Sequence, residues 1–285
     1  MLSSALSFSL MGVCVKAVGP RLPVAEVVLA RSLVSLVLSL AMLRQAGLSP
    51  WGHRRGLLIL RGVVGTAALL CVFAALTQLP LAAATVLQYL QPTFTALLAW
   101  ALLGERLTGR IVLATLLGWL GVLVLSSPGM LGSLRSSGTI QLPAIGVWLA
   151  IAGALLSAVA YVSVRALGRS EHPLVIVFYF PLVGVALTLP STLLNPMLPS
   201  AWEMVGLLGV GVFTQLGQIG ITKGLLGLPA ARATALSYGQ VLLAALWGWW
   251  WFQEPVDSHT ALAAGLVLAA TLLSLRSRPS RAADR

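Results

Sequence analysis

The chain has 285 residues, of which 58% are hydrophobic and 9% are charged, and its mean hydropathy is +0.96. Soluble domains carry roughly 25% charged residues, and disordered chains are less hydrophobic still, so this composition excludes both classes. The net charge of +11 comes from basic residues between apolar runs rather than from one patch. This distribution favours the basic loops of a membrane protein over nucleic-acid binding.

Five apolar stretches of transmembrane length, about 20 residues each, occupy the first part of the chain. The first starts almost at Met1 without a basic segment before it or a small-residue cleavage site after it, which favours a membrane span over a cleaved signal peptide. Thr108 is a candidate N-cap for the fifth. The spans are predicted at 2–17, 23–43, 57–77, 81–103 and 108–125.

A segment rich in Ser, Gly and Pro, 127–141, is the predicted linker between a first repeat, 1–126, and a second repeat, 142–276. The last residues, 277–285, form a basic tail. The second repeat has five further predicted spans, at 142–166, 173–193, 204–226, 230–252 and 258–275.

The stretch 79–105 occurs twice, because residues 228–254 repeat its pattern at an offset of 149 positions. Each copy opens with Leu-Pro and continues with matching Ala-Thr, Tyr, Gln, Trp and Glu residues. An odd number of spans in each repeat makes the second repeat enter the membrane from the opposite side. We therefore predict an all-α membrane protein with ten transmembrane helices, arranged as two inverted-topology five-helix repeats.

Basic residues in the predicted loops set the orientation, since cytoplasmic loops carry an excess of Lys and Arg. With the N-terminus in the cytoplasm, most loop arginines, Arg61 among them, fall on the inner side. Only Lys16, Arg21 and Arg135 then fall outside. The sequence predicts an integral inner-membrane protein with both termini in the cytoplasm.

The hairpin 79–128 resembles the signature segment of EamA-type transporters in the drug/metabolite transporter superfamily. Residues 13–38, with Lys16 and Arg31 at the family's usual basic positions, and residues 160–190 are similar to the starts of the two EamA repeats. The resemblance implies a ten-helix fold and the movement of small organic metabolites across the inner membrane, frequently outward.

Two polar stripes lie at matching depths in the fourth and ninth spans. The members of each stripe recur every three or four residues and therefore share one helix face. Gln91 lies roughly 15 Å into its span, which is close to the bilayer midplane. Pro92 cannot donate to the carbonyl of Gln88, which leaves a free acceptor at this depth. The side chains of the two stripes either line a substrate cavity or form hydrogen bonds that hold the helices together. The candidate cavity residues are Thr85, Gln88, Tyr89 and Gln91 in one span and Thr234, Ser237, Tyr238 and Gln240 in the other.

Arg31 lies about 12 Å along the second span, where an unpaired guanidinium costs several kcal/mol. It either faces the cavity and binds an anionic group or pairs locally, although Glu26 is five residues away, a poor spacing for a helical pair. Thr66 and Gln215 form a further, weaker pair of cavity candidates at the offset of 149.

Glu105 and Glu254 end the two copies of the repeated stretch, beside turns. A carboxylate there can accept hydrogen bonds from the free N–H groups of the next helix, so we expect a structural role in the turn. None of the seven acidic residues lies at the centre of a predicted span, which disfavours coupling to protons or sodium through a buried carboxylate. The transport mechanisms that remain are facilitated diffusion, exchange, and coupling through Glu26.

No metal site or cofactor is predicted, because Cys14 and Cys71 lie in apolar spans and the three histidines are scattered in loops. An enzyme is therefore disfavoured. A signalling protein is disfavoured because the sequence contains neither an appended soluble domain nor a long tail. We expect a secondary transporter that exports small metabolites, such as amino acids or drugs, by alternating access around a mid-membrane cavity; the alternative is an importer or facilitator of the same fold. The expected partners are the metabolite and the lipid bilayer, with no nucleic acid, and glycine-rich helix faces leave a homodimer open.

Overall fold

The computed structural model describes most of the chain, and its described residues are helical or lie in the loops between helices, with no strand among them. The described residues are 1–18, 21–78, 87–88, 90–105, 108–135, 144–194, 197–237 and 240, together with scattered residues between 243 and 273.

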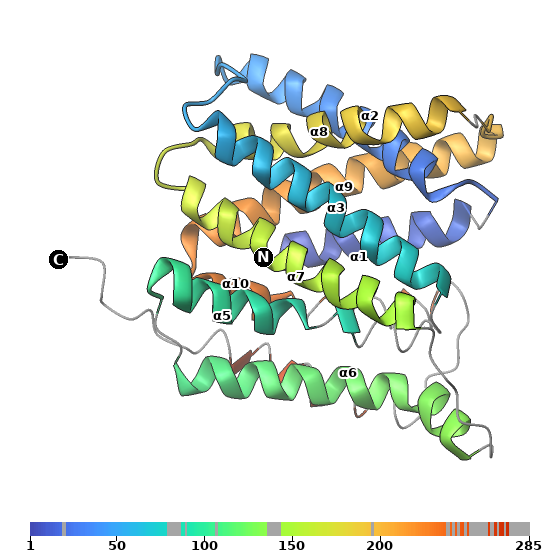
Figure 1. Cartoon of the computed structure of the whole chain (residues 1–285), viewed down its shortest axis with the longest axis vertical. Coiled ribbons are helices and arrows are strands. Elements are labelled where there is room, and N and C mark those ends of the chain that lie inside the picture. The colour runs from blue at the N-terminus through green and yellow to red at the C-terminus, as the bar shows by residue number, and fades with distance from the viewer. Residues whose placement is uncertain are drawn as a thin grey trace.

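The described helices lie side by side with their long axes roughly aligned, and the loops gather at the two ends of the bundle (Figure 1). They are α1 (Leu2–Val18), α2 (Val24–Gln45), α3 (Arg55–Gln78), α5 (Gln91–Leu103), α6 (Gly109–Arg135), α7 (Ala144–Leu167), α8 (Pro173–Leu194), α9 (Ala201–Gly227) and α10 (Ala230–Leu236).

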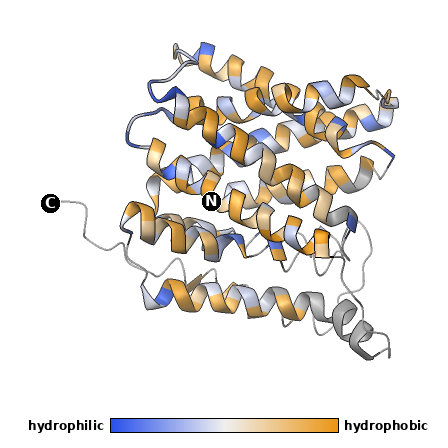
Figure 2. Ribbon diagram, in the orientation of Figure 1, coloured by the Kyte–Doolittle hydropathy of each residue, from blue (hydrophilic) through white to orange (hydrophobic). Residues whose placement is uncertain are grey.

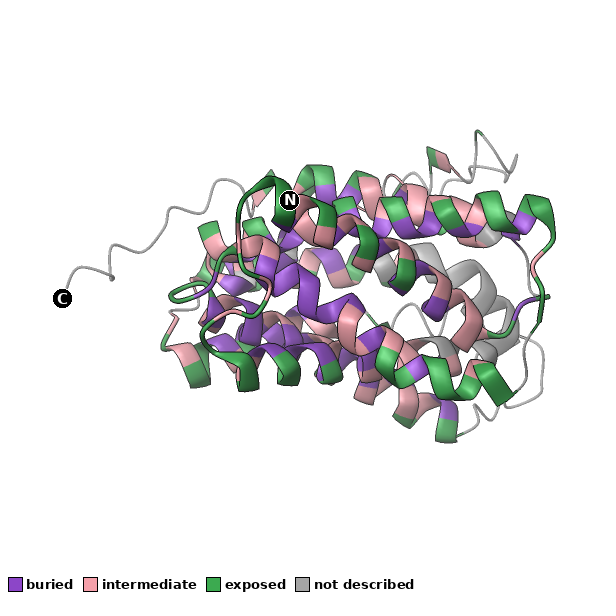
Figure 3. Cartoon of the chain, turned by 90° about the horizontal axis from the view of Figure 1, so that it is seen from above, coloured by how far each residue is buried: buried purple, intermediate pink, exposed green. Residues whose placement is uncertain are grey.

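Five helices of the described part are long and apolar enough to cross a membrane: α2, α3, α7, α8 and α9. Hydrophobic residues run along the helices, whereas hydrophilic residues gather mainly in the loops at their ends (Figure 2). The outer faces expose large apolar side chains such as Trp148 and Trp202, while polar side chains such as Ser32 and Thr95 are buried (Figure 3). This distribution of side chains fits a helical bundle that is surrounded by lipid rather than by water.

Helices of the first predicted repeat pack on helices of the second. The main packing partners are α1 with α9, α2 with α8 and α9, α3 with α7 and α8, and α5 with α7 and α10. Any space enclosed at the centre of the bundle therefore has walls from both parts of the chain.

Glycines on α9 allow α1 to approach closely. A Cβ at Gly217 would lie 2.8 Å from the ring of Phe8, and a Cβ at Gly220 would lie 2.9 Å from the Cβ of Ser4. The Ser4 hydroxyl uses this proximity to donate to the Gly217 carbonyl at 2.8 Å. Small residues and hydroxyl hydrogen bonds are the usual means by which membrane helices pack.

Helix boundaries follow local signals. A capping box at Ser200 and Glu203 starts α9, and Gly104, with a φ of 66°, ends α5 in the left-handed region that glycine adopts without strain.

Two segments can be compared with the predicted boundaries. The fourth span is predicted to begin near 81, but 81–86 lie outside the described residues; 87 and 88 are helical, and α5 begins at Gln91. Pro92 lies in the first turn of α5, where its missing N–H costs no hydrogen bond within that helix. The helix α6 continues to Arg135, so 127–135 of the predicted linker are helical.

Candidate functional site

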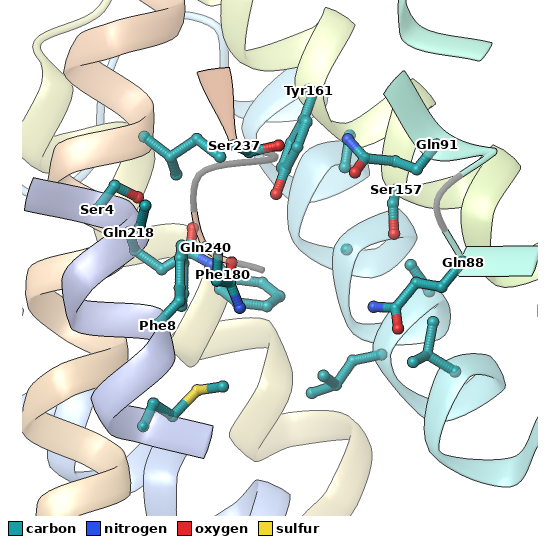
Figure 4. A pocket seen from close by; sticks show the side chains of 18 of the residues that line it. Ser4, Phe8, Gln88, Gln91, Ser157, Tyr161, Phe180, Gln218, Ser237 and Gln240 are labelled. Atoms are coloured by element: carbon teal, nitrogen blue, oxygen red, sulfur yellow. The ribbon is translucent and has the colours of Figure 1, made fainter. Parts of the chain in front are cut away.

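A cavity of about 310 Å³ lies inside the helical bundle. Its walls come from α1, α2, α3 and the start of α5 in the first part of the chain, and from α7, α8, α9 and the segment after α10 in the second (Figure 4). Polar lining side chains are Ser4, Arg31, Arg61, Gln88 and Gln91 from the first part and Ser157, Tyr161, Gln218, Ser237 and Gln240 from the second.

Five of the eleven predicted cavity residues border this cavity, and they come from both copies of the repeated stretch and from α2. These are Arg31, Gln88, Gln91, Ser237 and Gln240. Three others, Thr85, Tyr89 and Tyr238, lie outside the described residues.

The three remaining predicted residues, Thr66, Gln215 and Thr234, are buried and do not line the cavity. Gln215 Nε2 donates to Ser39 Oγ at 2.8 Å and lies beside a cleft that is too narrow for a water molecule. Thr234 Oγ1 donates to the Ala230 carbonyl at 3.0 Å. These contacts hold helices and helix turns in place, as polar side chains in membrane helices commonly do.

Neutral hydrogen-bonding groups face the cavity from opposite sides. Gln88 and Gln91 stand on one side, and Gln218, Ser237 and Gln240 on the other (Figure 4). Gln91 is the first residue of α5, and its amide is only weakly engaged within that helix. Its contact with Thr95 Oγ1 is 3.5 Å long, which leaves the amide group able to turn toward a molecule in the cavity.

Arg31 extends from α2 to the cavity and is only 6% exposed. Its guanidinium carbon lies 5.2 Å from the centre of the Phe180 ring, within the range of a cation–π interaction. Glu26 instead accepts a hydrogen bond from the Met197 N–H at 2.9 Å. Of the two predicted alternatives, the structure shows Arg31 in the cavity lining. Among the described residues, no acidic side chain forms an ion pair with it.

Arg61 lines the same cavity, although the sequence predicted it on the cytoplasmic side of the membrane. It lies on the second turn of α3, is 2% exposed, and places its guanidinium carbon 4.4 Å from the centre of the Phe180 ring. Its Nη2 donates to Gln218 Oε1 at 3.1 Å. Gly65, one turn later, leaves room for it, because a Cβ there would lie 2.6 Å from Arg61 Nη1. One signal was available: Arg61 is the only charged residue in the apolar run 57–77.

Glu105 joins the two parts of the chain at one end of the bundle. Its Oε1 accepts from Arg165 Nε at 2.8 Å, and its Oε2 accepts from the Ala230 N–H at 2.7 Å. We expected the helix that follows Glu105 to supply a partner; the N–H on Oε2 is that of Ala230, in the first turn of α10, where backbone N–H groups have no acceptor within the helix. We call these three residues the Glu105 cluster. Glu254 lies outside the described residues.

The arrangement of the cavity suits binding. Among the residues that the structure describes, no group of three His, Cys, Asp or Glu side chains could hold a metal ion, and no acidic side chain lines the cavity. The lining instead presents two guanidinium groups, neutral amides and hydroxyls, and the rings of Phe8, Tyr161 and Phe180. Such a lining can surround a small polar molecule and separate it from lipid.

Known proteins are similar to this chain in sequence or in fold. The model of the EamA-like transporter family matches residues 1–127 and 144–276. The chain is 29% identical to the pseudopaline exporter CntI of Pseudomonas aeruginosa over 276 residues, which are 96% of this chain and 94% of the relative. It is 30% identical to solute carrier family 35 member G1 of Homo sapiens over 197 residues, 67% of this chain and 54% of the relative. A crystal structure of a protein with 21% identity has the same fold, with a TM-score of 0.80 over 97% of both chains.

Proposed function

Because the chain belongs to the EamA-like transporter family, we propose that it is a secondary transporter that exports small organic metabolites by alternating access around the central cavity. It is an integral membrane protein with named transporters among its relatives, which points to transport rather than catalysis. The observation that carries the proposal is the cavity of about 310 Å³ with polar lining from both parts of the chain. The outward direction is supported by the similarity to an exporter.

The polar lining supports a transport site because such groups are costly within a membrane unless they face one another, a cavity or a substrate. Gln91 is the first residue of α5, and Ser237 follows the last residue of α10. Transporter sites are often built where membrane helices are interrupted, since the backbone groups freed there can also bind a substrate.

The packing of the helices supports an arrangement of two inverted five-helix repeats. Exchanging the repeats would exchange α1 with α7 and α3 with α9, the first and third spans of each. The contact between α1 and α9 would then exchange with the contact between α3 and α7, and the contact between α2 and α8 would map onto itself; all three contacts are present. In this arrangement the repeats rock about the site between them, with both termini in the cytoplasm.

We further propose that transport follows the substrate gradient and depends only weakly on pH. The described lining contains no carboxylate that could carry a proton through the cavity. Transport into vesicles at several pH values, with and without an uncoupler, measures this. A steep, uncoupler-sensitive proton dependence would contradict the proposed driving force, and net inward transport under all gradients would favour an importer.

The test of the site is a metabolite export screen, in whole cells and in reconstituted vesicles, on the wild type and the double variant Gln91→Ala, Gln240→Ala. Two lost hydrogen bonds of about 1 kcal/mol each should lower transport roughly 30-fold for the cognate molecule. The matched control is Gln45→Ala with Gln78→Ala, since both of these glutamines are exposed at helix ends. A folded cavity variant that exports at the wild-type rate would remove the proposed site.

A further inference from the structure

Two arginines from neighbouring helices meet at one aromatic ring in the wall of the cavity. Arg31 on α2 and Arg61 on α3 have their guanidinium carbons 5.2 Å and 4.4 Å from the centre of the Phe180 ring. The two cations are therefore no farther apart than the sum of these distances. Both residues are more than nine-tenths buried, and both line the cavity.

No described carboxylate neutralises this pair of charges. Glu105 and Glu203 bind Arg165 and Arg21. Glu171 accepts from backbone N–H groups of the loop between α2 and α3, and Glu26 from the backbone before α9. All four described acids are thus engaged away from the cavity.

Several donors of the two guanidinium groups have no hydrogen-bond partner within the described structure. They are Arg31 Nε, Arg61 Nε and Arg61 Nη1. The contact from Arg61 Nη2 goes to Gln218, a neutral amide. The ring of Phe180 attracts a cation but supplies no oxygen acceptor. Buried donors and charges are normally satisfied, so this cluster lacks an anionic oxygen ligand.

We propose that Arg31, Arg61 and Phe180 form a subsite for a carboxylate group of the transported molecule. The substrates are then small metabolites with at least one carboxylate, an assignment that rests on the proposed transport function. A guanidinium binds a carboxylate through two parallel hydrogen bonds, and two guanidiniums of different helices can hold two carboxylates or share one.

The other residues that line the cavity determine which further functional groups of the substrate can be bound. The amides of Gln88 and Gln91 face the cavity from the side opposite Gln218 and Gln240 (Figure 4). These groups donate and accept hydrogen bonds without charge, so they suit the hydroxyl, amide or amino groups of the substrate. The cavity volume of about 310 Å³ is at the small end of ligand pockets.

The subsite is tested by thermal unfolding of the purified full-length protein with matched probes. The pairs are succinate and succinamide, L-glutamate and L-glutamine, and L-aspartate and L-asparagine, with inorganic phosphate and sulfate as separate arms, each used well above millimolar concentration. We expect the acids to raise the melting temperature and the amides to have little effect. Equal effects of acid and amide would overturn the proposal, as would no effect of any acid or stabilisation by phosphate and sulfate alone.

The variants Arg31→Gln and Arg61→Gln remove one charge each. Either should lower the affinity for the acids roughly 10- to 100-fold, since a hydrogen bond to a charged group is lost. Each should also raise the melting temperature without ligand, because an unpaired buried charge is removed; a merely structural arginine would show the opposite change. Arg61→Lys should retain part of the acid response. Arg44→Gln on α2 and Arg55→Gln on α3 are the matched controls, because both arginines are exposed.

Failure of the proposed carboxylate subsite can be distinguished from failure of the proposed transport function. Acid binding that depends on the two arginines, together with no transport in vesicles, would leave the subsite standing and remove the transport function. Transport of neutral molecules that depends on Gln91 and Gln240, with no acid response, would remove only the carboxylate subsite.

Discussion

Replacing Glu105 with glutamine should weaken the contact between α5 and the second part of the chain. Opposite charges roughly 4 Å apart attract by about 4 kcal/mol at an effective dielectric constant of about 20. Partial dehydration of the two side chains, 16% and 28% exposed, offsets some of this attraction. Arg165 would also keep its hydrogen bonds to the carbonyls of Leu225 and Leu226. The expected loss in the free energy of unfolding is about 2 kcal/mol.

A double-mutant cycle measures this contact without the other effects of each substitution. Glu105→Gln, Arg165→Gln and the double variant are compared by thermal or denaturant unfolding in detergent, and the expected coupling energy is about 1–3 kcal/mol. Arg169→Gln is the control, because Arg169 is an exposed arginine of the loop that follows α7. A coupling to Arg165 no larger than the coupling to Arg169 would refute the role of the Glu105 cluster.

Three further outcomes are expected. Gly65→Ala should lower acid affinity about 10-fold by displacing Arg61, whereas Gly56→Ala, whose Cβ would meet nothing within 4 Å, should leave it unchanged; equal effects would contradict the packing argument. Ser200→Ala should cost about 1 kcal/mol of unfolding free energy through loss of the N-cap of α9, and an unchanged melting temperature would contradict it. A reporter that functions only in the cytoplasm should be active when it is fused after Arg285. Activity of a reporter that functions only outside the cytoplasm would overturn the predicted orientation.

The long apolar helices could be predicted from the sequence because each is a continuous apolar run with distinct ends. The predicted spans 23–43 and 173–193 agree closely with α2 and α8. The start of α5 could not be predicted in this way. The segment before it is as apolar as the helix itself, so hydropathy contains no boundary at Gln91, and the proline there is compatible with either a kink or a helix start.

The rotation of a helix about its axis was also beyond the sequence. Gln215 and Gln218 lie three residues apart on α9, and both are polar residues in an apolar run. Only Gln218 lines the cavity, whereas Gln215 donates to Ser39 on α2. Glycines such as Gly217 and Gly220 seat α9 against α1, and this tertiary contact decides which face of the helix points inward.

The position of Arg61 in the cavity wall could not be predicted for a related reason. Counting basic residues toward orientation assigns a charge near a span end to the aqueous side, since long side chains commonly reach the interface. In the structure the side chain of Arg61 instead lies against Phe180. Its environment depends on a ring from a helix more than a hundred residues away in sequence, which no local pattern contains.

The contact between Arg31 and Phe180 has a consequence for the symmetry of the protein. Positions 31 and 180 are separated by the same 149 residues that relate the repeated stretches, so equivalent positions of the two repeats touch each other. Two identical repeats would place either two cations or two rings there, and neither arrangement gives a cation against an aromatic face. The two predicted repeats differ at this point, so the positive charge of Arg31 and Arg61 lies on the wall that the first part of the chain supplies. With the proposed carboxylate subsite, a bound molecule with one charged end would have a single preferred orientation in the cavity.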